Sequence, residues 1–284
     1  MEPGKVSATP NSDAANRRWR AALHFFLSLG FVGSLLALPS AVVLAAAPLK
    51  KPDDIPMPTL SARFADAAQV KLINARKKFQ ADPMSVPAAW ALGQACFWRG
   101  EFAGNDEERK ALANEGIAVC RALTIRAPTV PEGHYYLAMN LGQLARTKWL
   151  EALGIVKDLE HGLMLAGGMN PRLDHAGADR CLGLLYRDAP GWPVSVGSKS
   201  KARTHLLLAV ELAPDFPENH LVLIETWLMW KEKKTLQRDL DTLAALLPKA
   251  RQQLTGEDWA ALWDDWEHRW REVQARAAQL LKKK

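Results

Sequence analysis

Apolar residues recur at intervals of three and four along the chain after residue 59, and no stretch alternates with a period of two. The first spacing places apolar side chains on one face of an α-helix, whereas strict alternation would indicate a β-strand. The pattern therefore predicts an all-α chain. The expected helices cover residues 60–81, then the pairs 86–99 with 106–126, 131–147 with 150–167, 174–187 with 199–213 and 217–231 with 234–247, and finally 256–281.

A proline-rich segment is written twice between the expected helix pairs. Residues 128–134 read P-T-V-P-E-G-H, and residues 214–220 read P-D-F-P-E-N-H. The first proline cannot continue a helix, and the second stands where a helix can begin. The glutamate after it suits the positive end of the helix dipole. The segment therefore predicts a turn between successive helical hairpins. Prolines at the first position of this turn, or of degenerate copies of it, are Pro83, Pro128, Pro171, Pro214 and Pro248.

The second helix of the third pair carries the packing pattern of the tetratricopeptide repeat. Ala202, Leu206, Ala209 and Pro214 supply in order the small residue, the large residue, the alanine and the proline of that pattern. Small side chains at these positions let neighbouring helices approach closely. The chain therefore resembles a tetratricopeptide-repeat protein. The predicted fold is all-α, a superhelix of helical hairpins with an N-terminal signal or anchor segment and a C-terminal capping helix.

The N-terminal 47 residues have the order of a secretory signal, in which a basic patch precedes an apolar run that ends in small residues. Arg17, Arg18 and Arg20 supply the patch, and residues 21–47 supply the run. The run is also long enough to remain as a membrane anchor. In either case the rest of the chain is expected outside the cytoplasm, in the periplasm. The predicted domains are the signal or anchor over 1–47, a proline-rich linker over 48–58, the repeats over 59–250, and a Trp-striped helix with a lysine tail over 251–284.

Two tracts resemble a narrower family. Residues 133–146 read GHYYLAMNLGQLAR, and residues 174–220 begin DHAGADRCLGLLYRDAPGW and end LAPDFPENH. They are similar to the T-component family of TRAP transporters. The resemblance implies an extracytoplasmic helical superhelix with a central hydrophobic pore or cleft, and a periplasmic solute-binding protein as partner. No cysteine stands directly after the apolar run of residues 21–47, so the lipid anchor that some members carry is not expected.

The first helices of such repeats line the inner, concave surface, so side chains at fixed positions after each turn proline are predicted to face it. Most of these side chains are apolar, aromatic or methionine. Such a surface favours a hydrophobic small ligand or a protein partner over a solvated face. The alternative is that a short superhelix packs them as core. The predicted groove residues are Trp90, Phe97, Trp98, Tyr135, Met139, Gln143, Leu182, Leu185, Tyr186, Leu221, Glu225, Leu228 and Met229.

Other tryptophans indicate two further contact regions. Trp192 stands between Gly191 and Pro193 in a loop, residues 187–198, that is longer than a repeat turn needs. It is expected to cover the groove, to contact a partner, or to fill one end of the core. The last predicted helix has four tryptophans on one face, which we expect to cap the repeats, with partner docking or a homo-oligomer as the alternative. These are Trp259, Trp263, Trp266 and Trp270.

Charge and motifs argue against several functional classes. The formal net charge of +6 comes partly from the chain ends, and no basic stripe suggests nucleic-acid binding. Cys96, Cys120 and Cys181 form no CxxC pair and are expected as buried core residues, so neither a metal nor a cofactor is expected. The sequence contains no phosphate loop, nucleophile elbow or HExxH motif.

The histidines and one polar cluster are the remaining candidates for catalysis. His134 and His220 occupy equivalent turn positions, which favours packing over chemistry. Asp174, His175, Asp179 and Arg180 fall on one predicted helix, where capping and ion pairing are the simpler roles. No catalytic residue is therefore predicted. The sequence favours an extracytoplasmic binding or adaptor protein, and the alternative is an envelope scaffold that acts through its outer face and Trp-rich helix.

Overall fold

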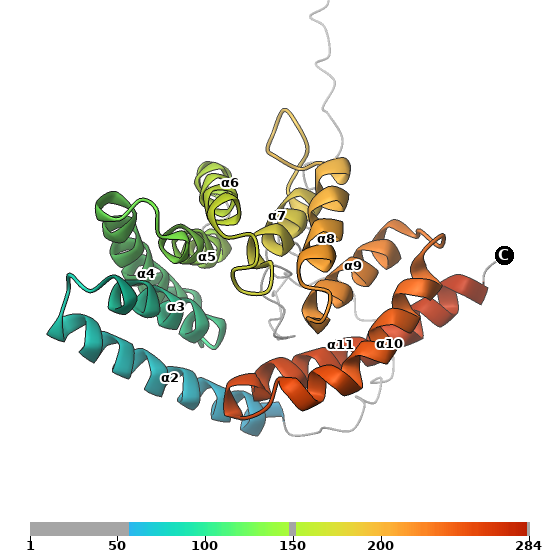
Figure 1. Ribbon diagram of the computed structural model, residues 1–284, viewed down its shortest axis with the longest axis horizontal. Coiled ribbons are helices and arrows are strands. Elements are labelled where there is room, and N and C mark those ends of the chain that lie inside the picture. The colour runs from blue at the N-terminus through green and yellow to red at the C-terminus, as the bar shows by residue number, and fades with distance from the viewer. Residues whose placement is uncertain (1–56, 148–151, 283–284) are drawn as a thin grey trace, which may run out of the picture.

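A computed structural model describes residues 57–147 and 152–282. The predicted signal or anchor segment and most of the predicted linker lie outside the described residues. Within the described range the chain forms ten α-helices and no β-strand, which confirms the predicted superhelix of helical hairpins (Figure 1). The helices are α2 (Met57–Ala81), α3 (Val86–Glu101), α4 (Asp106–Arg126), α5 (Pro131–Thr147), α6 (Ala152–Met169), α7 (Gly177–Asp188), α8 (Lys199–Leu212), α9 (Pro217–Trp230), α10 (Leu236–Gln253) and α11 (Glu257–Lys282).

The hairpins form an arc. Helices α3 and α4, α5 and α6, and α7 and α8 pack as pairs, and α9 packs against α10 and α11. In Figure 1, α3, α5, α7 and α9 lie toward the inner side of the arc, and α4, α6 and α8 lie toward its outer side. Helices α2 and α11 lie beneath the arc. Among the described helices, none is long and apolar enough to cross a membrane.

The repeated proline turn is closed by its own last residue. His134 Nε2 lies 2.8 Å from the carbonyl oxygen of Pro128, and His220 Nε2 lies 2.7 Å from that of Pro214. In each turn the ring N–H donates to the carbonyl of the first proline, which lies two residues past the end of the preceding helix. This bond explains why the same residue ends both copies of the segment.

Small residues bring the helices of a hairpin close together, as the repeat pattern requires. A Cβ atom on Gly93 of α3 would lie 2.2 Å from Cys120 Sγ of α4. A Cβ atom on Gly183 of α7 would lie 2.5 Å from the side chain of Leu206 of α8. Cys96, Cys120 and Cys181 are free and buried, which confirms the prediction that they are core residues.

Two predicted helix boundaries are wrong. The helix expected from residue 174 begins at Gly177, because Asp174, His175 and Ala176 have left-handed φ values of 50°, 54° and 62°. Pro248 does not end a helix, since α10 continues through it to Gln253. A proline inside a helix costs about 3 kcal/mol. Continuation buries Ala250 in the core that α10 shares with α9 and α11, and this packing offsets the cost.

The two helices beneath the arc approach each other. Lys71 Nζ on α2 lies 2.6 Å from Asp258 Oδ1 on α11, although the two residues are 187 positions apart. Figure 1 shows the beginning of α11 beside the blue, N-terminal half of α2. The first and last helices of the described chain therefore come into contact beneath the arc.

Candidate functional site

The predicted groove residues fall into two groups. Trp90, Trp98 and Met139 are partly exposed, and Met229 is exposed. The other nine are packed between helices, so the accessible part of the inner side is formed by fewer predicted residues than the sequence indicated. The nine buried residues are Phe97, Tyr135, Gln143, Leu182, Leu185, Tyr186, Leu221, Glu225 and Leu228.

Two of the buried residues show how they pack between helices. Tyr186 of α7 donates its hydroxyl to Glu160 of α6 at 2.6 Å, so it points toward the outer layer. Gln143 of α5 donates to the Phe97 carbonyl of α3 at 3.3 Å and so lies between two inner helices. Positions counted from Pro171 are shifted on α7, because that helix begins three residues later than expected.

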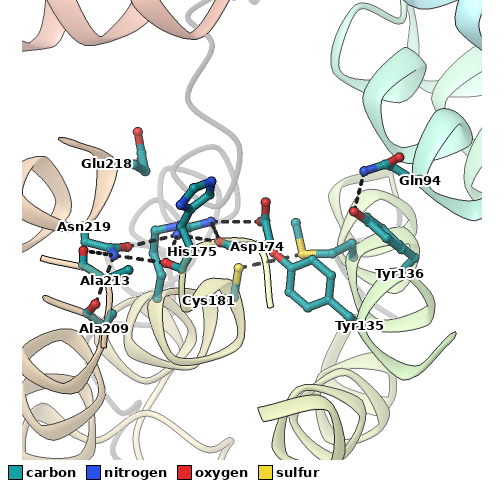
Figure 2. Close-up of polar contacts among 12 residues, drawn as sticks. Gln94, Tyr135, Tyr136, Asp174, His175, Cys181, Ala209, Ala213, Glu218 and Asn219 are labelled. Carbon is teal, nitrogen blue, oxygen red and sulfur yellow. Dashed lines mark hydrogen bonds and ion pairs between the residues drawn. The ribbon is translucent and has the colours of Figure 1, made fainter. Parts of the chain in front are cut away.

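A polar network centred on Asp174 lies on the inner side, just before α7 (Figure 2). Tyr135 of α5 donates its hydroxyl to Asp174 Oδ2 at 2.5 Å, and Arg180 Nη2 donates to the same oxygen at 3.0 Å. Arg180 Nη1 also donates to Asn219 Oδ1 of α9 at 2.9 Å, and Asn219 Nδ2 donates to the His175 carbonyl at 3.0 Å. The network therefore joins three successive inner helices at one place.

The charges in this network are well defined. Burial, reinforced by the Asp174 carboxylate, raises the pKa of Tyr135 well above its usual value, so the phenol stays a neutral donor. Burial lowers the pKa of Arg180, but Asp174 together with Tyr135, Cys181 and Glu218 outweighs this effect, so the pKa of the guanidinium is raised. Burial lowers the pKa of His175, which favours the neutral imidazole. The Asp174 side chain is 35% exposed, so a carboxylate edge faces outward from an otherwise buried network.

The backbone beneath Asp174 adopts a conformation that L-residues rarely use. Asp174, His175 and Ala176 form a run of three left-handed residues, and such residues usually occur singly. The Gly177 N–H donates to the Leu173 carbonyl at 2.9 Å and closes the run. A Cβ atom on Gly177 would lie 2.3 Å from Tyr135 Oη. Glycine is therefore needed here for the Tyr135 hydroxyl to reach Asp174.

Aromatic rings flank the polar network on the α9 and α11 side. The His175 ring stacks on Phe216 with a centroid distance of 4.1 Å and an interplanar angle of 8°. Trp259 of α11 meets the His175 ring edge-on at 5.9 Å. The first turn of the C-terminal helix thus contributes a side chain to the inner side. The partly exposed His175 ring is held in place by aromatic contacts.

A second pair faces the Asp174 network from the N-terminal hairpins. Gln94 of α3 donates to the Tyr136 hydroxyl of α5 at 2.5 Å, and Trp90 stacks on the Tyr136 ring at 6.2 Å. Figure 2 shows Gln94 and Tyr136 on one side and Asp174 and His175 on the other. The inner side therefore presents amide and aromatic groups opposite a carboxylate and an imidazole.

Helix α11 covers the inner side of the last hairpin. Arg269 of α11 lies 2.8 Å from both Glu218 Oε2 and Glu225 Oε1 of α9, and it is also paired with Asp265 at 2.8 Å. Trp266 Nε1 donates to Glu218 Oε2 at 2.6 Å. Trp263 and Trp266 are buried, and Trp259 and Trp270 are partly buried against the same core. Within the chain, the Trp stripe thus packs on the repeats rather than remaining free.

Trp192 is not part of the core. Its side chain is 89% exposed, so the predicted alternative in which it fills one end of the core is wrong. Figure 1 shows the α7–α8 loop projecting from the outer side of the arc, away from the Asp174 network. This position suits contact with something outside the protein and does not suit a cover for the inner side.

The predicted polar cluster on the third hairpin is divided by the structure. Asp174, His175 and Arg180 belong to the inner network, whereas Asp179 pairs with His205 of α8 at 2.7 Å. Over residues 57–147 and 152–282 no group of three or more His, Cys, Asp or Glu side chains has the arrangement of a metal site. Sequence reasoning missed Asn219 and Phe216 as neighbours of this network, although both belong to the repeated turn.

Comparisons with known proteins assign this chain to no family. No family model matches it, and no curated protein matches it. Among solved structures it is similar to a thermophilic TPR protein from Thermus thermophilus, with 19% sequence identity and a TM-score of 0.49. The alignment covers 78% of this chain and 96% of the other. A likeness of this degree says nothing about ligands or partners.

Proposed function

We propose that this chain is an extracytoplasmic, non-catalytic binding or adaptor protein that serves TRAP-type solute transport. Its inner side would receive a segment of a periplasmic solute-binding protein or a hydrophobic small ligand. The observation that carries the proposal is the partly exposed Asp174–His175 pair, which a buried network holds in a left-handed turn on the inner side. Curved helical-hairpin arrays generally use their concave side for binding.

The construction of this pair supports a binding role. Three left-handed residues in succession cost free energy that the fold could avoid with an ordinary turn, and such costs concentrate at functional sites. The turn is held in this conformation by hydrogen bonds from Tyr135, Arg180 and Asn219. The result is a fixed carboxylate edge beside a fixed imidazole.

The neighbouring partly exposed residues suggest the chemistry of the bound group. Trp90, which stacks on Tyr136, and Met139, which contacts Cys181, offer apolar and polarisable surface, while Asp174 offers a hydrogen-bond acceptor with negative charge. A ligand or peptide side chain with an apolar body and a donor or cationic end would match both. Aromatic surface near a few fixed polar groups is the usual composition of such sites.

The titration behaviour supports a non-catalytic role. Burial raises the pKa of the Cys181 thiol to about 11, so little nucleophilic thiolate forms near neutral pH. Tyr135 is held as a neutral donor, and both contacts given to Asp174 Oδ2 are structural. These groups therefore hold one another in place and are not arranged to transfer a proton.

The proposed location and transporter partner are supported by the sequence. The order of basic, apolar and small residues over 17–47 favours export. The tracts 133–146 and 174–220, which resemble the T-component family, contain Tyr135, Tyr136, Asp174, His175, Arg180 and Asn219. The resemblance therefore falls on the residues that build the inner network.

Site-specific photo-crosslinking in living cells would test this function. A photoreactive amino acid at the partly exposed Trp98, one of the predicted groove residues, is expected to crosslink a solute-binding protein identified by mass spectrometry, and the same group at Ile125 of α4 is the control. A fusion to alkaline phosphatase, which is active only after export, tests location. Native mass spectrometry of the purified chain tests for a retained hydrophobic ligand. No crosslink at Trp98 together with no retained ligand would reject the proposed inner-side binding.

A second candidate function, an envelope scaffold, is favoured by one observation. Trp192 projects from the outer side with its side chain 89% exposed. A scaffold would hold its partner through this outer face and would keep binding it after Asp174→Asn. The inner-side proposal predicts that this substitution weakens binding, so one variant separates the two functions.

A further inference from the structure

The loop of residues 189–198, here called the Trp192 loop, is held firmly at its base. Gly197 N–H donates to the Pro190 carbonyl at 2.8 Å, and Ser198 N–H donates to the Tyr186 carbonyl at 2.8 Å. Ala189 and Val196 pack against the core of the second and third hairpins. These contacts fix the backbone at the base of the loop. The fold therefore determines the direction in which the loop projects.

The tip of this loop presents apolar side chains to solvent. Trp192 is 89% exposed and Val194 is 59% exposed, with Pro193 exposed between them. Scattered apolar side chains are common on protein surfaces. An exposed tryptophan beside two other apolar residues, at the tip of a loop with a fixed backbone, instead indicates a surface that binds something outside the protein.

Basic residues surround the base of the Trp192 loop. A parallel bridge between Gly191 and Gly197 holds the loop against the start of α8, which carries Lys199 and Lys201. Lys199 Nζ lies 3.1 Å from Glu232, which places the α9–α10 turn with Lys231, Lys233 and Lys234 beside it. The tip and the two lysine groups thus share one surface.

The charge of this surface is strongly one-sided. Residues 187–204 and 231–234 contain seven Lys or Arg and two Asp or Glu, while the formal net charge of the whole chain is +6. Both acidic residues are paired, Asp188 with Arg187 and Glu232 with Arg203, each at 2.6 Å. A further carboxylate, Glu160 of α6, lies 3.8 Å from Lys201. Seven basic residues thus stand against three carboxylates, Asp188, Glu232 and Glu160, so this surface has a net positive charge.

We propose that the Trp192 loop and its flanking lysines form a contact site for an anionic lipid bilayer surface, with Trp192 and Val194 entering the interfacial region. Tryptophan is enriched at the membrane interface, where its apolar ring and indole N–H are both satisfied. Lysines near the surface attract anionic headgroups. The site is independent of the proposed inner-side function and lies on the opposite side of the arc.

The size of the tip favours a bilayer over a protein partner. A stable protein interface buries on the order of 800 Å² on each partner. One tryptophan, one proline and one valine on a narrow loop supply far less than this. A bilayer needs no complementary shape, so a few interfacial side chains together with a basic field provide a weak, reversible attachment. Such an attachment would hold the inner side of the arc facing away from the membrane.

An environment-sensitive fluorophore on the loop tests the proposal in the full chain. Cys96, Cys120 and Cys181 are buried, so a thiol-reactive NBD dye would label a new surface cysteine selectively. Val194→Cys places the dye at the tip, and Ile125→Cys, at a position 78% exposed on α4, is the matched control. The probes are vesicles of POPC alone and of POPC with POPG at 7:3.

The expected result is a blue shift and an intensity increase for the dye at position 194, with the POPC–POPG vesicles and not at position 125. Lys199→Gln with Lys234→Gln should weaken vesicle binding roughly 30-fold, from a factor of about five for each lysine near the surface. Lys77→Gln with Lys78→Gln on α2 is the charge-matched control. Trp192→Ala should abolish the shift at position 194 while the far-ultraviolet circular dichroism stays unchanged.

Three outcomes would overturn the lipid proposal. One is the absence of any shift at position 194 at millimolar anionic lipid, and another is an equal shift at positions 125 and 194. The third is a shift at position 194 that grows with protein concentration in the absence of vesicles, which would indicate contact between copies of the chain. Because the control carries the same N-terminal segment, attachment through that segment alone would give the second outcome.

Discussion

Arg269 of α11 lies 2.8 and 3.0 Å from the two carboxylate oxygens of Glu225 on α9, which stands 44 positions earlier in the chain. The same guanidinium contacts Glu218 and Asp265 and is buried. Removing one partner of a buried pair leaves uncompensated charge and typically costs about 3–5 kcal/mol. We expect Arg269→Met to lower the free energy of unfolding by about 3 kcal/mol in urea denaturation followed by tryptophan fluorescence.

Arg271→Met, two positions further on the exposed face of α11, is the matched control and should change stability little. Hydrogen exchange would show which part of the fold loosens. Faster exchange across α11 and α9 in Arg269→Met fits the proposed anchoring of the C-terminal helix. Unchanged exchange there would show that the helix is held by its tryptophans alone.

Asp265 gives a pH dependence of definite sign. Burial raises its pKa from 3.8 to about 7, although Arg269 opposes the shift. Between these values the folded chain binds a proton that the unfolded chain releases, so this contribution to stability is complete below pH 3.8 and is lost as the pH rises to about 7. Relative to wild type, the free energy of unfolding of Asp265→Asn should therefore rise by about 1 kcal/mol for each pH unit between about pH 5 and 7.

The measurement for Asp265 is the unfolding free energy of variant and wild type at several pH values, with the exposed Asp264→Asn as control. Only the difference between variant and wild type is informative. Burial also raises the pKa of Glu101 to about 7, and this group contributes a change of the same sign to both proteins. A variant difference that does not vary with pH would contradict the assignment to Asp265.

Gly177 should tolerate no side chain while Tyr135 keeps its hydroxyl. Gly177→Ala places a methyl group 2.3 Å from Tyr135 Oη, and overpacking of this kind costs about 2 kcal/mol. Tyr135→Phe removes the opposing oxygen, so the double variant should be more stable than the sum of the two single effects predicts. Gly168→Ala on α6, where nothing lies within 4 Å, is the control and should be neutral or stabilising. Additive effects would show that the two groups do not compete for space.

The turn histidines should contribute to stability in both repeats. His134→Ala or His220→Ala removes a buried hydrogen bond to a proline carbonyl, and each should cost about 1–2 kcal/mol. His161→Ala on the exposed face of α6 is the control. Thermal unfolding monitored by circular dichroism would show the effect. A loss confined to one of the two positions would mean that the turns are not equivalent in energy.

The fold is predictable because its signals are local. The prolines of the repeated turn, the small residues Gly93 and Gly183, and the three-four spacing of apolar positions each determine structure within one hairpin. Most predicted helix bounds agree closely with the structure. The start of α7 and the end of α10 depend instead on distant contacts. No glycine marks the left-handed run at Asp174, and Pro248 is overridden by the burial of Ala250.

The candidate site is less predictable, because it depends on which residues of different hairpins meet. Asp174 could be recognised from the sequence as a charged candidate residue. The repeat register, however, assigns Tyr135 to the predicted groove and Asn219 only to the proline turn. Their contacts with Asp174 and Arg180 span 39 residues between helices. A repeat register locates each helix face, but it does not show that α11 covers Glu225. That cover depends on Arg269, which no local pattern singles out.

The approach of Lys71 to Asp258 has a consequence for how this architecture can change. A solenoid with free ends can gain or lose a hairpin, because each unit contacts only its neighbours. Here Lys71 Nζ of α2 lies 2.6 Å from Asp258 Oδ1 of α11, so an added or deleted hairpin would change the distance between the two helices and break this contact. The ion pair itself is exposed and contributes little energy. Its significance is geometric: because the first and last described helices contact each other, the number of hairpins between them is constrained by the path of the whole array.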